Sequence, residues 1–185
     1  MKVPEATVLG YALMGLLHQK AQSGYELRKV FATTPIGSFS DSPGSIYPAL
    51  ARLEKRRWIR AAGETGDNPR QRKRCSLTPA GLAELRRWLA LPVTCQEVSS
   101  STDRFWLRCA FVQQVLGIDE TLRFLREADR ETTTYLAGLR EYQKKFMTSV
   151  EFNSGQFAFE CGLAGVAVSL RGIRRAILQI ERNPL

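Results

Sequence analysis

The apolar positions in the first third of the chain predict three short amphipathic helices. In residues 5–18 they recur three and four apart, the period of one helical face. Ser23-Gly24 then interrupts the pattern, and residues 25–31 and 42–57 repeat it. Each segment therefore has one side that can enter a shared core, formed by Val8, Leu9, Ala12, Leu13, Leu16, Leu17, Leu27, Val30, Phe31, Ile46, Leu50 and Leu53.

The start of the third helix is open, because Pro48 limits where it can begin. Proline is tolerated in the first turn of a helix, whose N–H groups lack intrahelical partners. A helix capped by Ser45 places Pro48 in that turn. A helix capped by Ser42, with Pro43 as its first residue, places Pro48 in the interior, where proline destabilises the helix.

A β-hairpin and a fourth helix are predicted next. Residues 58–62 and 70–77 have the composition of strands, and the turn residues of 63–69 separate them. Thr78 and Pro79 suit the N-cap and the first residue of a helix that buries Leu82, Leu85 and Leu89 and ends at Pro92. Three helices followed by a hairpin is the order of a winged helix-turn-helix, which we assign to residues 1–92.

Residues 93–185 are expected to be all-α and to form a dimerisation domain. A helix over 102–116, with Phe105, Trp106, Cys109, Val112 and Leu116 inward, ends at Gly117. Asp119 can cap a second helix that reaches Val150, whose positions 122, 125, 129, 132, 136, 139, 143, 146 and 150 form a heptad-like seam. Asn153-Ser154-Gly155 turns the chain into a last helix with Phe159, Leu163, Val166, Leu170, Ile173, Ile177 and Ile180. A helical hairpin within one chain remains the alternative to pairing between copies.

Charge points to an anionic partner for the first half of the chain. The formal net charge is +9; residues 1–92 hold 15 Lys and Arg against 7 Asp and Glu, and residues 93–185 hold 12 against 11. The major groove of double-stranded DNA admits one α-helix, and basic wings contact phosphates or a minor groove. The predicted DNA-binding residues are Ser42, Ser45, Tyr47, Pro48, Arg52 and Lys55 of the third helix and Arg70, Arg72 and Lys73 of the wing. Strand alternation also places Arg74 on the same face of the wing as Arg70 and Arg72.

Nothing in the pattern indicates catalysis, a metal or a cofactor. The four cysteines form no CxxC pair, the single histidine is His18, and there is no Gly-rich phosphate loop. We therefore expect a protein that is not an enzyme. The first residues lack the pattern of a signal peptide, and the apolar run 8–17 is too short to span a bilayer, so we expect no membrane partner and a cytoplasmic location.

Three motifs carry a family resemblance: Ser23-Gly24-Tyr25-Glu26-Leu27, Ser42-Pro43-Gly44-Ser45-Ile46-Tyr47-Pro48 and Leu77-Thr78-Pro79-Ala80-Gly81. Together they resemble the PadR family of transcriptional regulators, in its longer branch with a helical C-terminal domain. The resemblance implies a homodimeric DNA-binding regulator, most often a repressor, with Ser42, Ser45, Tyr47 and Pro48 at the DNA end of the recognition helix. It also implies small aromatic effectors. Arg74-Cys75 departs from the family, which usually has an aromatic pair there.

Two alternatives stay open. In the first, the chain is a coiled-coil interaction module whose basic half binds RNA or an acidic protein, and equal binding to duplex DNA and duplex RNA would favour this alternative. For an effector, the apolar residues Leu13, Leu16 and Leu17 and the aromatic residues Phe105, Trp106, Tyr135 and Phe157 are candidates to line a site at a dimer junction. Ordinary core and interface packing would use the same residues.

Overall fold

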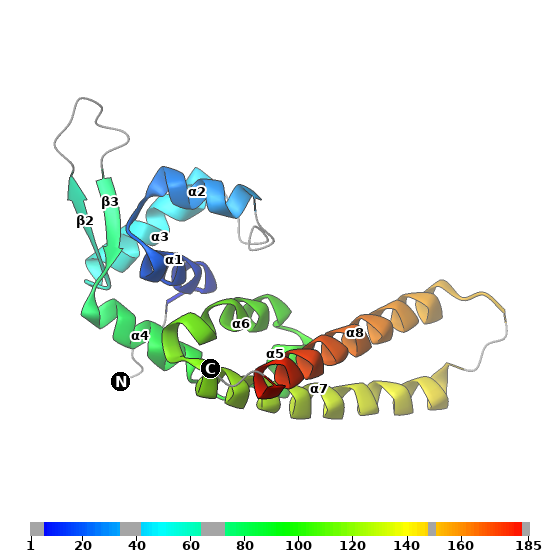
Figure 1. The fold of residues 1–185 in the computed structure, drawn as a ribbon. Helices are drawn as coiled ribbons and strands as arrows, with labels where there is room; N and C mark the ends of the chain where they lie inside the picture. The colour runs from blue at the N-terminus through cyan, green and yellow to red at the C-terminus, as the bar shows by residue number, and fades with distance from the viewer. Residues whose placement is uncertain (1–5, 34–41, 64–72, 148–150, 183–185) are drawn as a thin grey trace, which may run out of the picture. The chain divides into compact units, whose positions relative to one another are not determined.

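The computed structural model describes residues 6–33, 42–63, 73–147 and 151–182. The chain divides into two compact units, residues 1–89 and residues 90–185. Figure 1 shows the helices and strands of each unit.

The N-terminal unit is a winged helix-turn-helix, as predicted. Its helices are α1 (Val8–Gln19), α2 (Gly24–Thr33), α3 (Pro43–Lys55) and α4 (Pro79–Leu89), and its strands are β1 (Gln22–Ser23), β2 (Ile59–Gly63) and β3 (Lys73–Leu77). The predicted apolar stripes form the core: Leu13, Leu27, Ile46 and Leu85 are completely buried. Thr78 accepts a 3.1 Å hydrogen bond from the N–H of Gly81 and so caps α4, which confirms the predicted helix start.

Helix α3 begins at Pro43 and contains Pro48 in its interior. Ser42 is the N-cap, and its hydroxyl accepts a 3.2 Å hydrogen bond from the N–H of Gly44. Of the two starts that the sequence left open, this is the one in which Pro48 cannot donate to the carbonyl of Gly44. The first turns of α3 are therefore held in part by the cap and by the packing of Ile46 and Leu50, which are buried.

Strand β1 was not predicted, and it makes the wing part of a three-stranded antiparallel sheet of order β1-β3-β2. Cys75 of β3 is flanked by Ala61 of β2 and by Gln22 of β1. The side chain of Gln22 is buried and donates a 3.1 Å hydrogen bond to the carbonyl of Leu16. A two-residue strand has too few positions to show a period of two, so only its pairing with a distant segment defines it.

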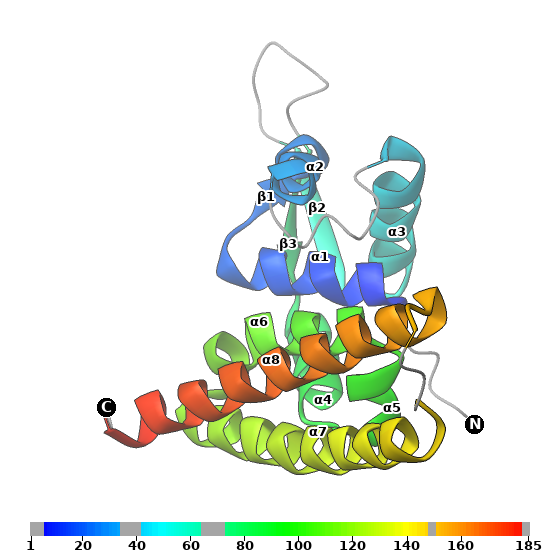
Figure 2. The same cartoon turned by 90° about the vertical axis from the view of Figure 1, so that its right-hand side faces the viewer.

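The C-terminal unit is all-α, as predicted. It consists of α5 (Cys95–Ser99), α6 (Thr102–Leu116), α7 (Ile118–Phe146) and α8 (Ser154–Arg182). The two long helices, each of 29 residues, lie side by side and antiparallel (Figures 1 and 2). Their contact, together with α5 and α6, encloses a core of Val93, Val98, Phe105, Val112, Phe124, Leu125, Ala128 and Ile173.

Four expectations about this unit need correction. Helix α5 was not predicted, and Trp106, expected to point inward, is 46% exposed. Gly117, not Asp119, is the N-cap of α7, and Asp119 lies in its first turn. Asn153 does not turn the chain together with Gly155: its side chain accepts a 3.0 Å hydrogen bond from the N–H of Gln156, and Ser154 and Gly155 are already helical. Val150 lies outside the described residues.

A buried ion pair fixes the beginning of the C-terminal unit. Arg108 of α6 is fully buried, and its Nη1 lies 2.5 Å from Oε2 of Glu97 in α5. Its guanidinium also donates to the carbonyls of Leu91 and Pro92. Burial lowers the pKa of Arg108, and the hydrogen bond to Glu97 opposes that shift. The arginine thus holds the segment that follows α4 against α5 and α6.

Candidate nucleic-acid interface

One face of α3 is free of core contacts and carries the predicted DNA-binding positions. Ile46, Ala49, Leu50 and Leu53 are buried, which leaves the opposite face to solvent. Pro48, Ala51 and Lys55 recur three and four apart along that face, and all three are exposed. Two small or compact residues followed by a lysine form a surface that can approach a groove closely without steric obstruction.

Arg52 lies on one flank of this face, beside the start of α1. It borders a small hollow of about 50 Å³ together with Thr7, Gly10, Leu53 and Arg56. Arg52 and Arg56 are both exposed, four residues apart on the same side of α3. Of these two arginines, only Arg52 was predicted to bind DNA. Arg56 lies one helical turn from Arg52, so the two arginines place two positive charges on the same side of α3. The helical period along α3 could have predicted this pair.

Tyr47 lies on the other flank, over the beginning of α2. A Cβ atom added to Gly24 would come within 2.6 Å of Tyr47 Cε1, so the tyrosine ring packs where Gly24 has no side chain. The ring remains 49% exposed, and the neighbouring Tyr25 is 61% exposed. Tyr47 is therefore both a packing residue and a surface residue, and Tyr25 is a second exposed tyrosine, which was not among the predicted DNA-binding residues.

The remaining predicted residues of α3 lie at its N-terminal end. Ser42 is exposed and caps the helix, and Ser45, one turn later, is partly buried. The exposed hydroxyls and N–H groups of a helix start suit contact with an anion such as a phosphate.

The wing brings a further cation towards α3. Lys73, the first residue of β3, is 71% exposed in its side chain, and its Nζ lies 4.0 Å from Oε2 of Glu54 on α3. Arg74 instead turns back to the sheet, where its Nη2 donates a 2.7 Å hydrogen bond to the carbonyl of Ala21. Arg74 was predicted to share a face with the basic residues of the wing tip, but its guanidinium is held at the sheet by this hydrogen bond. Arg70 and Arg72 lie outside the described residues.

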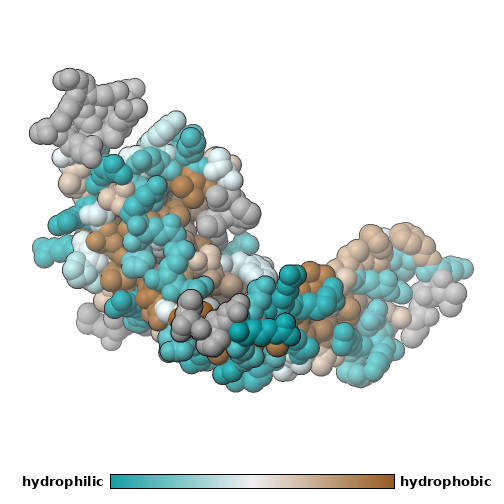
Figure 3. All heavy atoms as spheres, viewed as in Figure 1, coloured by the Kyte–Doolittle hydropathy of each residue, from teal (hydrophilic) through white to brown (hydrophobic). Residues whose placement is uncertain are grey.

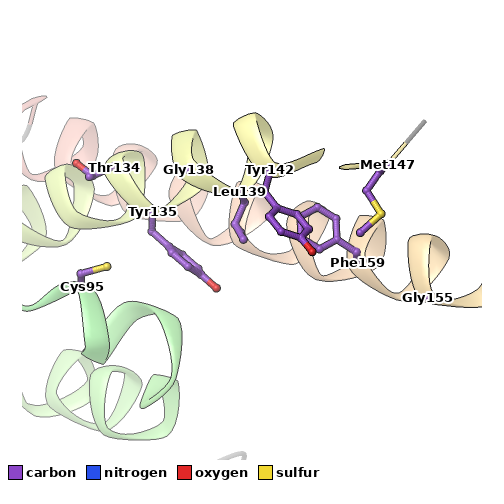
Figure 4. Close-up of a pocket in the computed structure, with 9 residues that line it drawn as sticks. All are labelled: Cys95, Thr134, Tyr135, Gly138, Leu139, Tyr142, Met147, Gly155 and Phe159. Carbon is purple, nitrogen blue, oxygen red and sulfur yellow. The ribbon is translucent and has the colours of Figure 1, made fainter. Parts of the chain in front are cut away.

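Four of the candidate effector residues are core residues. Leu13, Leu16 and Leu17 are buried in the N-terminal unit and Phe105 is buried in the C-terminal unit, so these four side chains belong to the two cores. A groove of about 690 Å³ is present elsewhere in the C-terminal unit, between α5, α7 and α8 (Figure 4). Of the predicted set it contains only Tyr135; the other lining residues are Cys95, Thr134, Gly138, Leu139, Tyr142, Met147, Gly155 and Phe159.

No three side chains of the types His, Cys, Asp and Glu gather among the described residues as a metal ion would require. No helix in the described part of the chain has the length and apolar character needed to cross a membrane.

Three helices, a hairpin wing and an exposed, cationic third helix define a winged helix-turn-helix protein of the DNA-binding kind. Comparison with known families agrees: residues 13–87 match the transcriptional regulator PadR-like family. Residues 13–87 therefore carry a PadR-like domain, as found in this family of transcriptional regulators.

Two curated relatives share different portions of the chain. The negative transcriptional regulator PadR of Bacillus subtilis is 29% identical over 154 residues, which are 81% of this chain and 82% of the relative. A probable transcriptional regulator of Mycobacterium tuberculosis, Rv1176c, is 33% identical over 87 residues, or 46% of each chain.

Similar solved structures include that of B. subtilis PadR in complex with operator DNA. It is 22% identical to this chain, covers 96% of it and 100% of the solved chain, and has a TM-score of 0.44. The complex of B. subtilis PadR with p-coumaric acid is 24% identical, with 95% and 99% coverage and a TM-score of 0.41.

Proposed function

We propose that the protein is a homodimeric repressor that binds a specific operator in double-stranded DNA. The observation that carries the proposal is the exposed face of α3, where Pro48, Ala51 and Lys55 stand opposite a fully apolar buried face. A helix with this division can enter the major groove while the rest of the unit holds it in place. The relative from B. subtilis, a negative regulator, supports repression as the direction of control.

Each predicted residue takes a role that follows from its place. Arg52 reads a guanine edge or binds a phosphate, because a guanidinium can donate two hydrogen bonds to either. Ser42, Ser45 and Tyr47 donate to phosphates at the start of α3, and Pro48 packs against the sugar or a base edge. Lys55 and Lys73 neutralise backbone phosphates beside the groove, and the charge of the wing sequence assigns the same role to Arg70 and Arg72.

The homodimer follows from the way such domains recognise DNA. A single short helix reads only a few base pairs, and two copies related by a two-fold axis read two half-sites. We assign dimerisation to residues 93–185, whose long helices α7 and α8 provide a surface for a second copy. Residues 1–92 remain the DNA-binding domain in this proposal, acting in the cytoplasm.

The groove of Figure 4 is the place where we propose that a small aromatic effector binds. The ring centroids of Tyr142 and Phe159 lie 5.4 Å apart along its wall, and Tyr135 extends the aromatic lining. A volume of several hundred Å³ with apolar walls suits a ligand of one or two rings. The effector must bind with different affinity to the DNA-bound and the free protein, since otherwise it changes nothing.

A binding titration tests the main proposal. The purified protein is titrated onto the DNA upstream of its own gene, onto a scrambled duplex and onto the corresponding RNA duplex, at several salt concentrations. We expect tight binding of one dimer to the first duplex alone, with an affinity that falls steeply as salt rises. Equal affinity for all three duplexes would overturn the proposal and favour the basic interaction module.

Two arginine variants sharpen the assignment. Arg52→Ala should weaken specific binding by about 1–3 kcal/mol and relax sequence preference, because it removes a proposed base contact. Arg86→Ala is the matched control. Arg86 is exposed on α4, and its substitution removes the same charge from the same unit. An unchanged sequence preference in Arg52→Ala would remove Arg52 from the base-reading residues.

A further inference from the structure

Helix α8 has two seams on opposite faces. Its inner seam consists of Phe159, Leu163, Val166, Leu170, Ile173, Ile177 and Ile180, all of them buried or partly buried. A second seam, which we call the outer seam, lies two residues earlier at every position and consists of Phe157, Cys161, Ala164, Val168, Arg171, Arg175 and Leu178. Two residues correspond to about 200° around a helix, so the outer seam faces away from the inner one.

The outer seam is apolar at most positions and is exposed throughout. Phe157 and Val168 are each 57% exposed, and Leu178 is 50% exposed. Figure 3 shows apolar surface over the N-terminal part of α8, on a molecule whose long helices otherwise present many polar side chains. One apolar stripe is enough for a helix to pack on its neighbour. A second apolar stripe on the opposite face indicates that another element covers that face.

Two glycines beside the outer seam leave open space around α8 among the described residues. Gly165 and Gly172 lie one heptad apart on the same flank, in the interior of α8. A Cβ atom at either position would meet nothing within 4 Å. Glycine weakens a helix relative to alanine, and Gly162 of the same helix also has open space, so the glycines alone select no partner. At Gly165 and Gly172 they permit the backbone of another helix to come close.

We propose that the outer seam packs antiparallel on the outer seam of a second copy, with the two-fold axis at Val168. This inference rests on the proposed homodimer and specifies its contact. In this register Val168 meets the partner's Val168, and Phe157 meets the partner's Leu178. Gly165 and the partner's Gly172 then lie on the same flank and within one residue of the same height, where the two backbones can come close.

Charge selects this arrangement over a parallel one. A parallel pair would place each residue beside its own copy, so that Arg171 and Arg175 repel their counterparts. In the antiparallel register Glu160 lies level with the partner's Arg175, and symmetry forms that pair twice. Within the described residues Arg171 and Arg175 have no ion pair of their own, whereas Arg174 on the other side of α8 binds Asp129 of α7 at 2.6 Å. The outer arginines are therefore available to a second copy.

Cysteine cross-linking tests the register in the full-length protein. Cys95 and Cys161, the two exposed cysteines, are first replaced by serine. Val168→Cys should then form a disulfide between copies under mild oxidation, because the two Cα atoms would lie close to the two-fold axis. Leu178→Cys is the matched control: in this register its own copies are about 30 Å apart. It should stay uncross-linked alone and cross-link when mixed with Phe157→Cys.

Exchanging the charges of Glu160 and Arg175 tests the register by a second measurement, which does not depend on oxidation. Glu160→Arg and Arg175→Glu should each weaken the dimer at least tenfold in sedimentation equilibrium, and the double variant should return to within about threefold of the original affinity. Circular dichroism checks that α8 stays helical in each variant.

The outcomes separate the two levels of the proposal. Cross-linking of Val168→Cys with rescue by the double charge variant supports the register. A dimer that persists while Val168→Cys stays reduced, or in which Leu178→Cys links to itself, overturns the register and leaves the proposed function standing. A protein that sediments as a monomer at all concentrations overturns both the register and the homodimer.

Discussion

The hydroxyl of Tyr11 donates a 2.7 Å hydrogen bond to Oε1 of Glu84, 73 residues further along the chain. The same carboxylate receives two hydrogen bonds from Arg87, of 2.9 and 2.7 Å. The ring of Tyr11 stacks on Trp88 with centroids 4.2 Å apart and an angle of 5° between the planes. This cluster fastens α1 to α4, the two helices that flank the DNA-binding elements in sequence.

Removing the hydroxyl should destabilise the N-terminal unit. Tyr11→Phe keeps the stacked ring and the hydrogen bonds between Glu84 and Arg87, and it removes one hydrogen bond to a charged group. We expect the free energy of unfolding to fall by about 1.5–3 kcal/mol. Urea denaturation followed by fluorescence measures it. Tyr25→Phe is the control, since Tyr25 is 61% exposed and its variant should unfold at the same midpoint. Equal midpoints for all three proteins would contradict the role of the hydrogen bond.

Glu84 should make the stability of this unit depend on pH in the acid range. Burial alone would raise the pKa of its carboxyl, but the hydrogen bonds from Arg87 and Tyr11 outweigh burial and hold the pKa below its ordinary value of 4.5. A lowered pKa in the folded state stabilises the fold above the unfolded pKa, and this stability is lost as pH falls through the folded pKa.

Glu84→Gln supplies the comparison. We expect the difference in unfolding free energy between the original protein and Glu84→Gln to be constant above pH 4.5 and to shrink below it. Denaturation midpoints at a series of pH values give this difference. A gap that widens on acidification would show that the carboxyl is not stabilised in its ionised form.

Breaking the Arg108–Glu97 pair should destabilise the C-terminal unit far more than removing it altogether. Arg108→Met leaves the buried carboxylate of Glu97, at 5% exposure, with only the longer contact to Arg104 at 3.6 Å. Loss of one member of a buried pair costs about 3–5 kcal/mol, and the remaining contact with Arg104 should place the cost towards the lower end. Replacing both residues by methionine removes the uncompensated charge and should recover part of that loss. Thermal unfolding of the two variants tests this order, and a double variant less stable than Arg108→Met would refute it.

The sequence predicted the elements whose cause is local. The apolar stripes of α1, α2 and α3, the Thr78 cap of α4 and the long seam of α8 all depend on residues within one helix. Strand β1 depends on pairing with Cys75 and Arg74, more than 50 residues away, and no local period marks it. The sequence also left open whether Ser42 or Ser45 caps α3. Proline in a helix interior is unfavourable locally, and the packing of Ile46 overrides that preference.

The candidate site was predictable to the extent that it lies on one helix face. Helical spacing alone places Pro48, Ala51 and Lys55 together, and the structure leaves all three exposed. Arg74 was grouped with the wing on strand alternation, yet its guanidinium binds the carbonyl of Ala21, a partner created by the unpredicted strand pairing. Tyr25 and the contact between Tyr47 and Gly24 likewise depend on how α2 meets α3, which no single segment encodes.

The end of α3 offers a stabilising substitution. Arg57 has a φ of 58°, the left-handed conformation, and it is the one non-glycine residue of this kind in the described chain. The N–H of Trp58 donates to the carbonyl of Leu53 and that of Arg57 to Glu54, the pair of bonds that ends a helix in a Schellman motif, where glycine is preferred. Arg57→Gly should therefore raise stability by about 0.5–1 kcal/mol, since relief of the left-handed strain exceeds the added freedom of the unfolded chain. Arg57→Ala is the control, because it removes the same charge but keeps the strain. A higher unfolding midpoint for glycine than for alanine would confirm the origin of the effect in the backbone, and equal midpoints would exclude it.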